Sequence, residues 1–580
     1  MTNKGRFLVA VMLTLLMAGQ AFAYESLTGP TGTLYWDKNK ASKGYTLYYP
    51  EQGTDTYLID MQGNLVNKWP GVGNPMLTED GYLFGIFGDR HNYSNPLVLM
   101  DWNGKIVQKF IAPGNSTEAK IPGIVCSDGV TRQTVFHHEW RVAKKKDGSQ
   151  TVFILARVLR SKAEVEAAGF TCGDLETGFG AVKGLADTDA ILEFDMKGNL
   201  IWQWEFWDRM IQNKNTTGSR YSENITDYGK YYVKNATSIG GDFVHGNSVF
   251  YNPDRDELLL NPFFMDSFYV FKHNITTEQA QGAAGDFAYR WGDPSEYNPA
   301  KYPAGIKSVG GKTSFGKNDS QIGGSHTVHW IPEGLPGEGN FLLFSNSGPK
   351  PKTVGSPYLD GASAIVEINP YTTNASSYNA PKDNWKTASY VRQDVAGVGT
   401  SNSISNQIVM YFTPQLAWGT YERQGFYSWH ISGVQRMPNG NTMVISGESG
   451  HIFEITPTKT GVWNTDLFCM NSDVVWDFVN PYCMPRANDQ KAMLAADPHY
   501  TPTATMYKYR PAGVDGQVFR AWRYSPNFSG FKGKKLKPLG PLNDPKKWNK
   551  YFKGFGFGGG ISVGGGGAGA AGTGGIGAGY

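Results

Sequence analysis

Residues 190–204 read Ala-Ile-Leu-Glu-Phe-Asp-Met-Lys-Gly-Asn-Leu-Ile-Trp-Gln-Trp. Apolar residues run up to Lys-Gly-Asn and resume beyond it. This is typical of two antiparallel strands joined by a tight turn in which Gly or Asn adopts a positive φ. Similar phrases occupy residues 57–69 and 97–110, with weaker copies at 364–369 and 451–463. The recurrence of one hairpin along the chain predicts a repeat architecture built from strands.

A second hairpin phrase alternates with the first and begins at a histidine or a nearby polar residue. Its copies pair residues 138–142 with 151–155, 245–249 with 257–260, 326–330 with 340–344, and 430–434 with 441–445. Two hairpins make a four-stranded blade, and helical periodicity is scarce throughout the chain. The sequence therefore predicts an all-β fold, a β-propeller of about six blades within residues 44–553.

The beginning of the chain has the composition of a secretory signal peptide. Lys4 and Arg6 precede the apolar residues 7–17, and the small-residue pattern Ala-Phe-Ala follows at 21–23. We therefore expect residues 1–23 to be removed and the protein to be periplasmic or extracellular. No stretch approaches the roughly 20 apolar residues that a membrane-spanning helix needs, so no membrane span is predicted.

The regions flanking the repeats have different compositions. Residues 24–43 are expected to form a small strand-rich N-terminal segment. Residues 554–580 are almost entirely Gly and Ala, and such a composition buries too little apolar surface to offset chain entropy. We expect a disordered Gly-rich C-terminal tail, with self-assembly through its aromatic residues as the alternative.

The charge and the cysteine spacing argue against nucleic-acid binding and against a zinc site. A net charge of +3, with Lys and Arg interleaved with Asp and Glu, offers no basic stripe for nucleic acid. Export places the four cysteines in an oxidising compartment, and short loops favour the pairs Cys126–Cys172 and Cys469–Cys483, while two other pairings stay open. No cysteine spacing matches a zinc site, so no metal is expected.

Four histidines stand at equivalent positions of successive repeats, each at the start of an expected innermost strand. They are His138, His245, His326 and His430. Because the innermost strands of a propeller surround its axis, we expect these imidazoles to share one site. An imidazole can act as a nucleophile, a general acid or base, or a metal ligand.

The remaining histidines are given structural interpretations. His329 follows His326 at an odd offset, so it should face the other side of the strand and pack between blades. Surface or turn positions are expected for His137, His273, His451 and His499.

Several phrases resemble those of the bacterial aryl-sulfate sulfotransferase family. They include Gly32-Thr-Leu-Tyr-Trp36, His137-His-Glu-Trp140, Asp242-Phe-Val-His-Gly-Asn-Ser-Val249, Ser325-His-Thr-Val-His-Trp330, Ser428-Trp-His-Ile-Ser-Gly-Val-Gln-Arg-Met-Pro-Asn-Gly-Asn-Thr442 and Val518-Phe-Arg-Ala-Trp-Arg-Tyr524. The likeness covers nearly the whole mature chain except its glycine tail. It implies a six-bladed exported propeller that moves a sulfuryl group from an aryl sulfate to a phenol through a sulfurylated histidine. No cofactor or nucleotide sulfate is implied.

The resemblance also assigns roles by position. His430 matches the nucleophile, and His245 and His326 match the sulfate-binding or acid–base histidines. Asn247 and Thr327 adjoin two of these histidines and are candidate donors to the sulfate oxygens.

Two stretches depart from the family pattern. One is residues 261–266, on the strand after His245, where the family commonly has polar and basic residues. In the other, the family places an arginine after the strand that ends at Phe344, whereas this chain offers Lys350 and Lys352. Lysine keeps the charge but lacks the planar fork that grips a sulfate. Arg436 is a candidate substitute, with an inter-blade ion pair as its alternative. His138 is either a structural polar residue near the channel or a further substrate contact.

Two other function classes stay open from the residues alone. A catalytically silent propeller that binds partners or builds an extracellular scaffold would fit the missing arginine and the glycine tail. A channel filled by Phe263 or Phe264 would favour that function. A redox or quinone-cofactor propeller is less well supported, because no Cys-x-x-Cys-His haem attachment sequence occurs.

Overall fold

The structure is a computed structural model, and it describes fifteen continuous ranges and two single residues of the chain. These are residues 32–51, 53–88, 94–115, 118–175, 182–234, 237–298, 321–347, 363–373, 384–397, 405–412, 430–448, 450–457, 474–479, 517–542 and 544–552, together with Asn92 and Ser428. The expected signal peptide, Lys350, Lys352 and the glycine tail lie outside this part of the chain.

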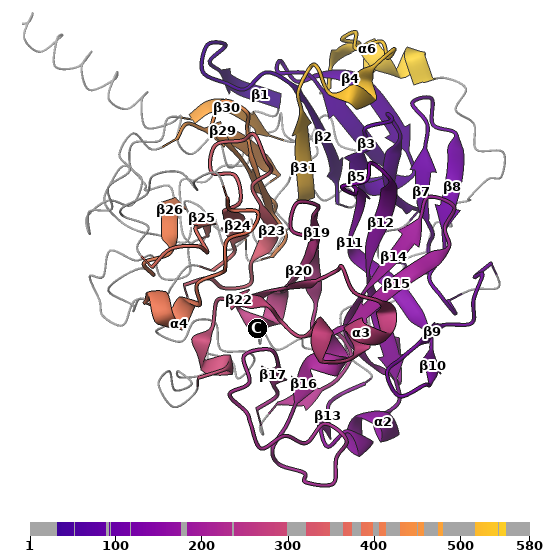
Figure 1. The fold of residues 1–580 in the computed structure, drawn as a ribbon. Helices are drawn as coiled ribbons and strands as arrows, with labels where there is room; N and C mark the ends of the chain where they lie inside the picture. Colours follow the sequence, from indigo (N-terminus) through magenta and orange to yellow (C-terminus); the bar gives the residue numbers. More distant parts are fainter. Residues whose placement is uncertain are drawn as a thin grey trace, which may run out of the picture.

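Six antiparallel sheets are arranged as the blades of a propeller, which confirms the predicted fold (Figure 1). Blade 1 contains β5 (Val72–Leu77), β6 (Leu83–Phe87), β7 (Leu97–Met100) and β8 (Ile106–Phe110). Blade 2 contains β11 (Thr134–Lys144), β12 (Gln150–Arg160), β14 (Ala186–Asp195) and β15 (Leu200–Glu205). Blade 3 contains β19 (Gly246–Asn252), β20 (Glu257–Pro262), β21 (Phe268–Lys272) and β22 (Tyr289–Trp291).

The other three blades follow the same order from the axis outward. Blade 4 contains β23 (His326–Trp330), β24 (Phe341–Ser345), β25 (Ala364–Ile368) and β26 (Ile408–Phe412). Blade 5 contains β27 (Gly433–Arg436), β28 (Thr442–Ser446), β29 (His451–Ile455) and β30 (Val474–Val479), with β1 (Gly32–Trp36) at its outer edge. Blade 6 contains β31 (Val518–Tyr524), β2 (Tyr45–Pro50), β3 (Asp55–Ile59), β4 (Asn64–Pro70) and β32 (Gly540–Pro541).

Blade 6 closes the ring by combining the two ends of the chain. The late strand β31 is innermost and pairs antiparallel with the early strand β2, with Tyr45 opposite Tyr524. Figure 1 shows the yellow β31 beside the indigo β2. Closure leaves no terminal blade face uncovered, because each blade then has a neighbour on both faces.

The core consists of apolar layers between neighbouring blades. Among the described residues, each pair of adjacent blades encloses its own cluster of buried apolar side chains. Leu258 and Leu260 contribute to the layer shared with blade 2, whereas Leu259 contributes to the layer shared with blade 4. Since successive side chains of a strand point to opposite faces, a strand buried on both sides has a continuous apolar run.

The aromatic residue that ends the repeated hairpin has a packing role. Trp204 of blade 2 stacks on Phe271 of blade 3, with ring centroids 3.9 Å apart and planes 7° from parallel. Its indole nitrogen donates to the carbonyl oxygen of Gly285 at 2.8 Å. The recurring terminal aromatic therefore links one blade to the next.

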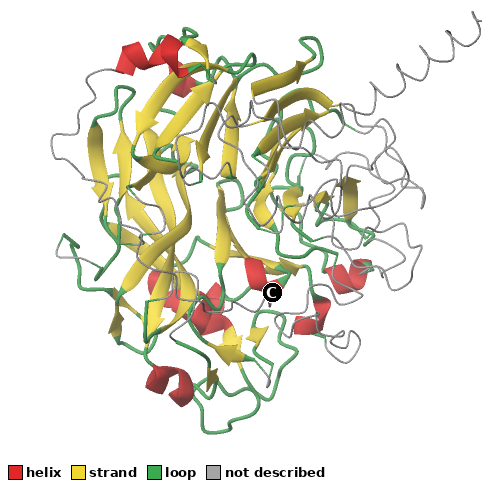
Figure 2. Cartoon of the chain, turned by 180° about the vertical axis from the view of Figure 1, so that it is seen from behind, coloured by secondary structure: helices red, strands yellow, loops and turns green. Residues whose placement is uncertain are grey.

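Short elements gather below blades 2 and 3, whereas helices are small and peripheral (Figure 2). The small strand pairs are β9 (Ile124–Val125) with β10 (Thr131–Arg132), β13 (Thr171–Cys172) with β18 (Ser238–Ile239), and β16 (Met210–Ile211) with β17 (Tyr231–Tyr232). The α-helices of the described residues are α2 (Lys162–Ala167), α3 (Thr277–Gln281), α4 (Gln393–Ala396) and α6 (Pro545–Trp548). No helix in the described ranges is long and apolar enough to cross a membrane.

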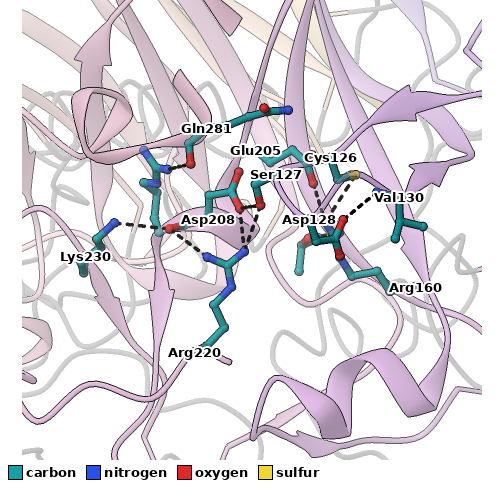
Figure 3. Close-up of polar contacts among 12 residues, drawn as sticks. Cys126, Ser127, Asp128, Val130, Arg160, Glu205, Asp208, Arg220, Lys230 and Gln281 are labelled. Atoms are coloured by element: carbon teal, nitrogen blue, oxygen red, sulfur yellow. Dashed lines mark hydrogen bonds and ion pairs between the residues drawn. The ribbon is translucent and has the colours of Figure 1, made fainter. Parts of the chain in front are cut away.

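Ion pairs attach these short elements to blade 2 (Figure 3). Asp208 accepts hydrogen bonds from Ser127 and Arg220, each at 2.6 Å. Arg160 pairs with Glu205, and both side chains are buried. The turn after β9 is thus joined to the segment that follows β15.

The expected bond between Cys126 and Cys172 is wrong, because both thiols are free. Cys126 is buried, and its sulfur lies 3.9 Å from Arg160 Nη2. Cys172 lies in β13, on a different small sheet. The intervening chain forms two long strands of blade 2, so short sequence separation did not bring the sulfurs together. Cys469 and Cys483 lie outside the described residues, and their bond stays a prediction.

Candidate active site at the propeller axis

Five innermost strands carry a non-glycine residue with positive φ, either within the strand or one or two residues before it. These residues are Asn74 (43°), His138 (51°), His245 (52°), Thr327 (55°) and Ile431 (51°). The pairing register also shifts within β5, β11, β19 and β23. Bulges redirect side chains. A residue other than glycine is strained in the left-handed conformation, and such residues concentrate at functional sites.

Aromatic rings from four blades form a closed circuit at the axis. Ring centroids lie 4.5 Å apart for His138 and His245, 5.5 Å for His245 and Phe263, and 5.4 Å for Phe263 and His326. Phe519 completes the circuit, 5.9 Å from His326 and 6.0 Å from His138. Three of the four histidines selected from the sequence therefore meet, as the repeat register predicts.

His326 is the most deeply buried of these imidazoles. Its exposed fraction is 2%, and burial is the main cause that lowers its pKa to about 3, with the charges of His430 and His245 acting in the same direction. Asn346, the partner of His326, also donates to the carbonyl oxygen of Ile431, the residue after His430, so the fourth histidine lies near this site as well. His326 is consequently a neutral imidazole at physiological pH.

The hydrogen bonds of Asn346 determine the tautomer of His326. Asn346 Nδ2 donates to the carbonyl oxygens of Ser428 (2.6 Å) and Ile431 (2.8 Å), so Asn346 Oδ1 is the atom that faces His326 Nδ1 at 2.7 Å. Because this oxygen can only accept, Nδ1 of His326 carries the hydrogen. The lone pair of His326 is therefore on Nε2.

His245 is oriented by a buried carboxylate. Its Nδ1 lies 2.6 Å from Asp242 Oδ2, and Asp242 also pairs with Arg157 at 2.5 Å. The charges of His245 and Arg157, together with the hydrogen bond from His245, overcome desolvation and lower the pKa of Asp242. An ionised Asp242 accepts the Nδ1 hydrogen of His245 and leaves Nε2 for chemistry.

His430 shows a related arrangement. Its Nδ1 lies 3.3 Å from Glu448 Oε1, and 21% of its side chain is exposed, compared with 15% for His245. Nδ1 of His245 and of His326 is thus hydrogen-bonded to an acceptor side chain, whereas Nδ1 of His430 makes the longer ion-pair contact.

The candidate sulfate donors serve as links between blades. Asn247 Nδ2 donates to the carbonyl oxygen of Ser325 at 2.8 Å, and Thr327 Oγ1 donates to that of Ser432 at 3.0 Å. Each bond joins the inner strand of one blade to that of the next. In this arrangement the two side chains hold the histidine-bearing segments in place.

Arg436 lies in the inter-blade ion pair that was the alternative to a substrate contact. Its Nη2 is 2.5 Å from Glu367 Oε2, and both side chains are buried. Nearby, His329 is buried and stacks on Phe250 of blade 3 at 5.0 Å, which confirms its predicted position between blades.

Buried cations near the axis come from residues that the sequence analysis did not select. Arg520 follows Phe519 on β31, pairs with Glu139 and donates to the carbonyl oxygen of Asn247 at 3.0 Å. Burial lowers the pKa of Arg520 to about 9. Its presence in the closing phrase 518–524, which resembles the sulfotransferases, is the signal that could have identified it.

Two histidines expected at the surface are buried. His137 has no exposed surface, and its Nδ1 lies 2.8 Å from His138 Nδ1. His273 is also buried, 2.8 Å from Glu193 and 2.7 Å from Asp256. The expectation for His137 was wrong, because it lies inside β11. His273 does lie in the turn after β21, but it is buried there because both of its ring nitrogens bond to carboxylates.

Within the described ranges, no group of three or more His, Cys, Asp or Glu side chains could hold a metal ion.

Comparison with known proteins adds no family assignment. No family model matches the sequence, and no curated protein matches it. Similar solved structures include a Bacteroides caccae protein of unknown function, with 10% identity over 72% of this chain and 90% of that chain and a TM-score of 0.31. Kuenenia stuttgartiensis hydrazine synthase shares 9% identity over 67% and 77%, with a TM-score of 0.27. A Lactobacillus plantarum protein shares 8% over 75% and 96%, with a TM-score of 0.27. At these values, the comparison carries no argument about function.

Proposed function

We propose that the axial histidines transfer a sulfuryl group from an aryl sulfate to a phenolic acceptor. The observation that carries the proposal is that Nδ1 of His245 and of His326 is hydrogen-bonded to Asp242 and Asn346, and that Nδ1 of His430 lies 3.3 Å from Glu448. Each imidazole can then present Nε2 as a lone pair or as a proton donor. The resemblance of the surrounding phrases to aryl-sulfate sulfotransferases supplies the substrate class.

His430 is the proposed nucleophile, since it is the most exposed of the three rings. Its Nε2 attacks sulfur, the S–O bond to the aryl group breaks, and the leaving phenolate takes a proton from an imidazolium at the axis. The acceptor phenol then gives its proton to the imidazole that has become neutral, its oxygen bonds to sulfur, and the S–N bond breaks, which restores neutral His430. His245 is the proposed proton carrier, because its Nδ1 is hydrogen-bonded to Asp242 and its Nε2 is left to give and take the proton.

The aromatic circuit suits an aryl substrate. Phe264 lies 5.0 Å from His245 and is partly exposed, while Phe519 contacts both His138 and His326. Aromatic side chains favour offset or edge contacts with a second ring. We further propose that the reaction takes place outside the cytoplasm, after removal of residues 1–23.

The second candidate is a catalytically silent propeller, and one observation favours it. Phe263 is buried between His245 and His326, and the nearby Arg520 is neutralised by Glu139. A filled axis without a free cation would bind sulfate poorly. The scaffold or binding function would then reside on the outer surface or the tail.

Incubation of the purified protein with 4-nitrophenyl sulfate and a phenol tests the proposal. We expect release of 4-nitrophenol and a trapped adduct of roughly 80 Da, the mass of SO₃, on the nucleophile of a two-step reaction. His430→Asn should abolish both, whereas His451→Asn on the outer strand β29 serves as the matched control. An adduct on His245 or His326 would reassign the nucleophile. Neither turnover nor label across a panel of aryl sulfates would favour the silent propeller.

A further inference from the structure

We propose that His138 is a second acid–base residue of this site, sharing one proton with His245, and that His137 and Asp189 position it. The inference rests on the proposed function and deepens it, because it assigns the proton that the phenol gains in one half-reaction and loses in the other.

The first argument is the distance between the two imidazoles. His138 stands in the bulge of β11, is partly exposed, and has its ring centroid 4.5 Å from that of His245. Two imidazolium ions at this separation repel each other, so the second proton binds more weakly than the first. One proton shared by the pair therefore gives one donor and one acceptor together.

The second argument is the hydrogen-bond arrangement behind His138. The Nδ1 atoms of His137 and His138 are 2.8 Å apart, so one of them carries a hydrogen and the other accepts it. His137 Nε2 lies 3.2 Å from Asp189 Oδ1, and burial lowers the pKa of His137, which keeps that ring neutral. A neutral His137 with its hydrogen facing the carboxylate must accept at Nδ1. His138 consequently donates from Nδ1 and uses Nε2 for proton exchange.

The third argument is that Asp189 connects both members of the pair. Its Oδ2 accepts a hydrogen bond from the backbone nitrogen of Gly246, the residue after His245, while its Oδ1 faces His137. A single buried carboxylate thus supports the peptide that carries His245 and the imidazole that orients His138. These contacts fix the orientation of both imidazole rings.

The charges around the pair favour retention of the shared proton. The titratable or charged groups are His137 and Glu139 on β11, Arg157 on β12, Asp187 and Asp189 on β14, Asp242 before β19, His326 on β23, His430 before β27 and Arg520 on β31. Arg520 is matched by Glu139. Arg157 pairs with Asp242 and lies opposite Asp189 in the ladder of β12 and β14, while Asp187, whose pKa burial raises to about 7, adds no charge below that pH. The excess of carboxylates stabilises a positive charge on His138 or His245.

The proton balance of the two half-reactions closes with this pair. When the aryl S–O bond breaks, the protonated member gives its proton to the phenolate oxygen, and both imidazoles are neutral. When the acceptor oxygen bonds to sulfur and the S–N bond breaks, a neutral member takes the phenolic proton. The pair then carries one proton again.

The test combines His138→Asn with two donors that differ in leaving group. Asn tolerates a positive φ, so the bulge should survive. Phenyl sulfate releases a basic phenolate that needs the proton, whereas 4-nitrophenolate needs it far less. Loss of a general acid costs about 100-fold or more. We expect His138→Asn to lower the rate of sulfurylation by phenyl sulfate by that factor, and the rate with 4-nitrophenyl sulfate by less than about threefold. One limb of the pH profile of kcat/KM should also disappear.

Controls separate this inference from the proposed function. His451→Asn should retain wild-type rates, and Asp189→Asn should move the pH limb without removing it. If His138→Asn does not fold, His138→Gly with added imidazole should regain activity towards phenyl sulfate. An active wild type whose His138 variants keep the same profile and leaving-group dependence overturns the inference alone. A wild type that forms no adduct overturns the proposed function and this inference with it.

Discussion

Replacement of Asp187 by Asn should change how stability depends on pH. Asp187 lies on β14 with 1% of its surface exposed. Burial, together with the charges of Asp242 and Asp189, raises its pKa from 3.8 to about 7 despite Arg157 nearby. In the unfolded chain the same carboxyl ionises near pH 4.

The sign of the effect follows from proton linkage. Between about pH 4 and pH 7 the folded protein keeps a proton that the unfolded chain has released, so the free energy of unfolding falls as pH rises. The slope approaches about 1.4 kcal/mol per pH unit, and a pKa difference of about three units gives about 4 kcal/mol in total. Asn resembles the protonated carboxyl in size and shape. The variant should therefore match the wild type near pH 4.5 and be more stable at pH 8.

Urea unfolding followed by tryptophan fluorescence at pH 4.5, 6 and 8 measures this difference. Other titrating groups, such as His326, affect wild type and variant alike and cancel in the comparison. Asp80→Asn, at an exposed turn of blade 1, is the matched control and should show no pH-dependent difference. A stability gap between Asp187→Asn and wild type that stays constant from pH 4.5 to 8 would refute the reasoning.

Three further predictions concern packing and the chain terminus. Arg436→Ala should lower the free energy of unfolding by about 3–5 kcal/mol in urea, because it leaves Glu367 buried without its partner, whereas Arg436→Met combined with Glu367→Leu should recover most of the loss. Cys126 should resist iodoacetamide in the native protein at pH 8 and react after unfolding, since burial raises the pKa of its thiol to about 12; rapid native labelling in a mass spectrum would contradict this. Deletion of residues 554–580 should leave the thermal midpoint unchanged, because a glycine tract buries little apolar area, and a large drop would show that it packs on the propeller.

The sequence was sufficient to predict the propeller and the convergence of its histidines. Repeated hairpins specify blades, and equivalent positions of successive blades face one axis, so His245 and His326 could be placed near each other without a structure. The aromatic ends of the hairpins likewise predicted contacts between blades, as Trp204 on Phe271 illustrates. These features depend on local periodicity, which a single sequence contains.

The side-chain directions at the bulges could not be predicted from sequence periodicity. His137 and His138 are neighbours on a strand, and regular alternation would direct them to opposite faces. The register shift between Phe136 and Trp140 alters that alternation, and the two Nδ1 atoms meet. A bulge adds no clear pattern to the sequence, so the expectation for His137 failed there.

Contacts between residues far apart in the chain were the second feature that the sequence did not predict. Arg436 could have reached either substrate or a neighbouring blade, and the choice depends on Glu367, which lies 69 residues away in the chain. The same holds for the free thiol of Cys126, whose surroundings include Arg160 from the end of β12. Both outcomes follow from which blade faces which, and not from spacing.

The strained positions at the axis are held by side chains from preceding blades. A bulge frees carbonyl groups that a regular ladder would use, and an unpaired buried carbonyl is costly. Asn74 of blade 1 donates to the carbonyl oxygen of His138 in blade 2, and Asn346 of blade 4 donates to that of Ile431 beside blade 5. His138 and Ile431 are themselves left-handed residues, each costing about 1–3 kcal/mol. His138 and Ile431 thus each depend on a donor from the blade before, and their conformation is a property of neighbouring blades together and not of any single blade.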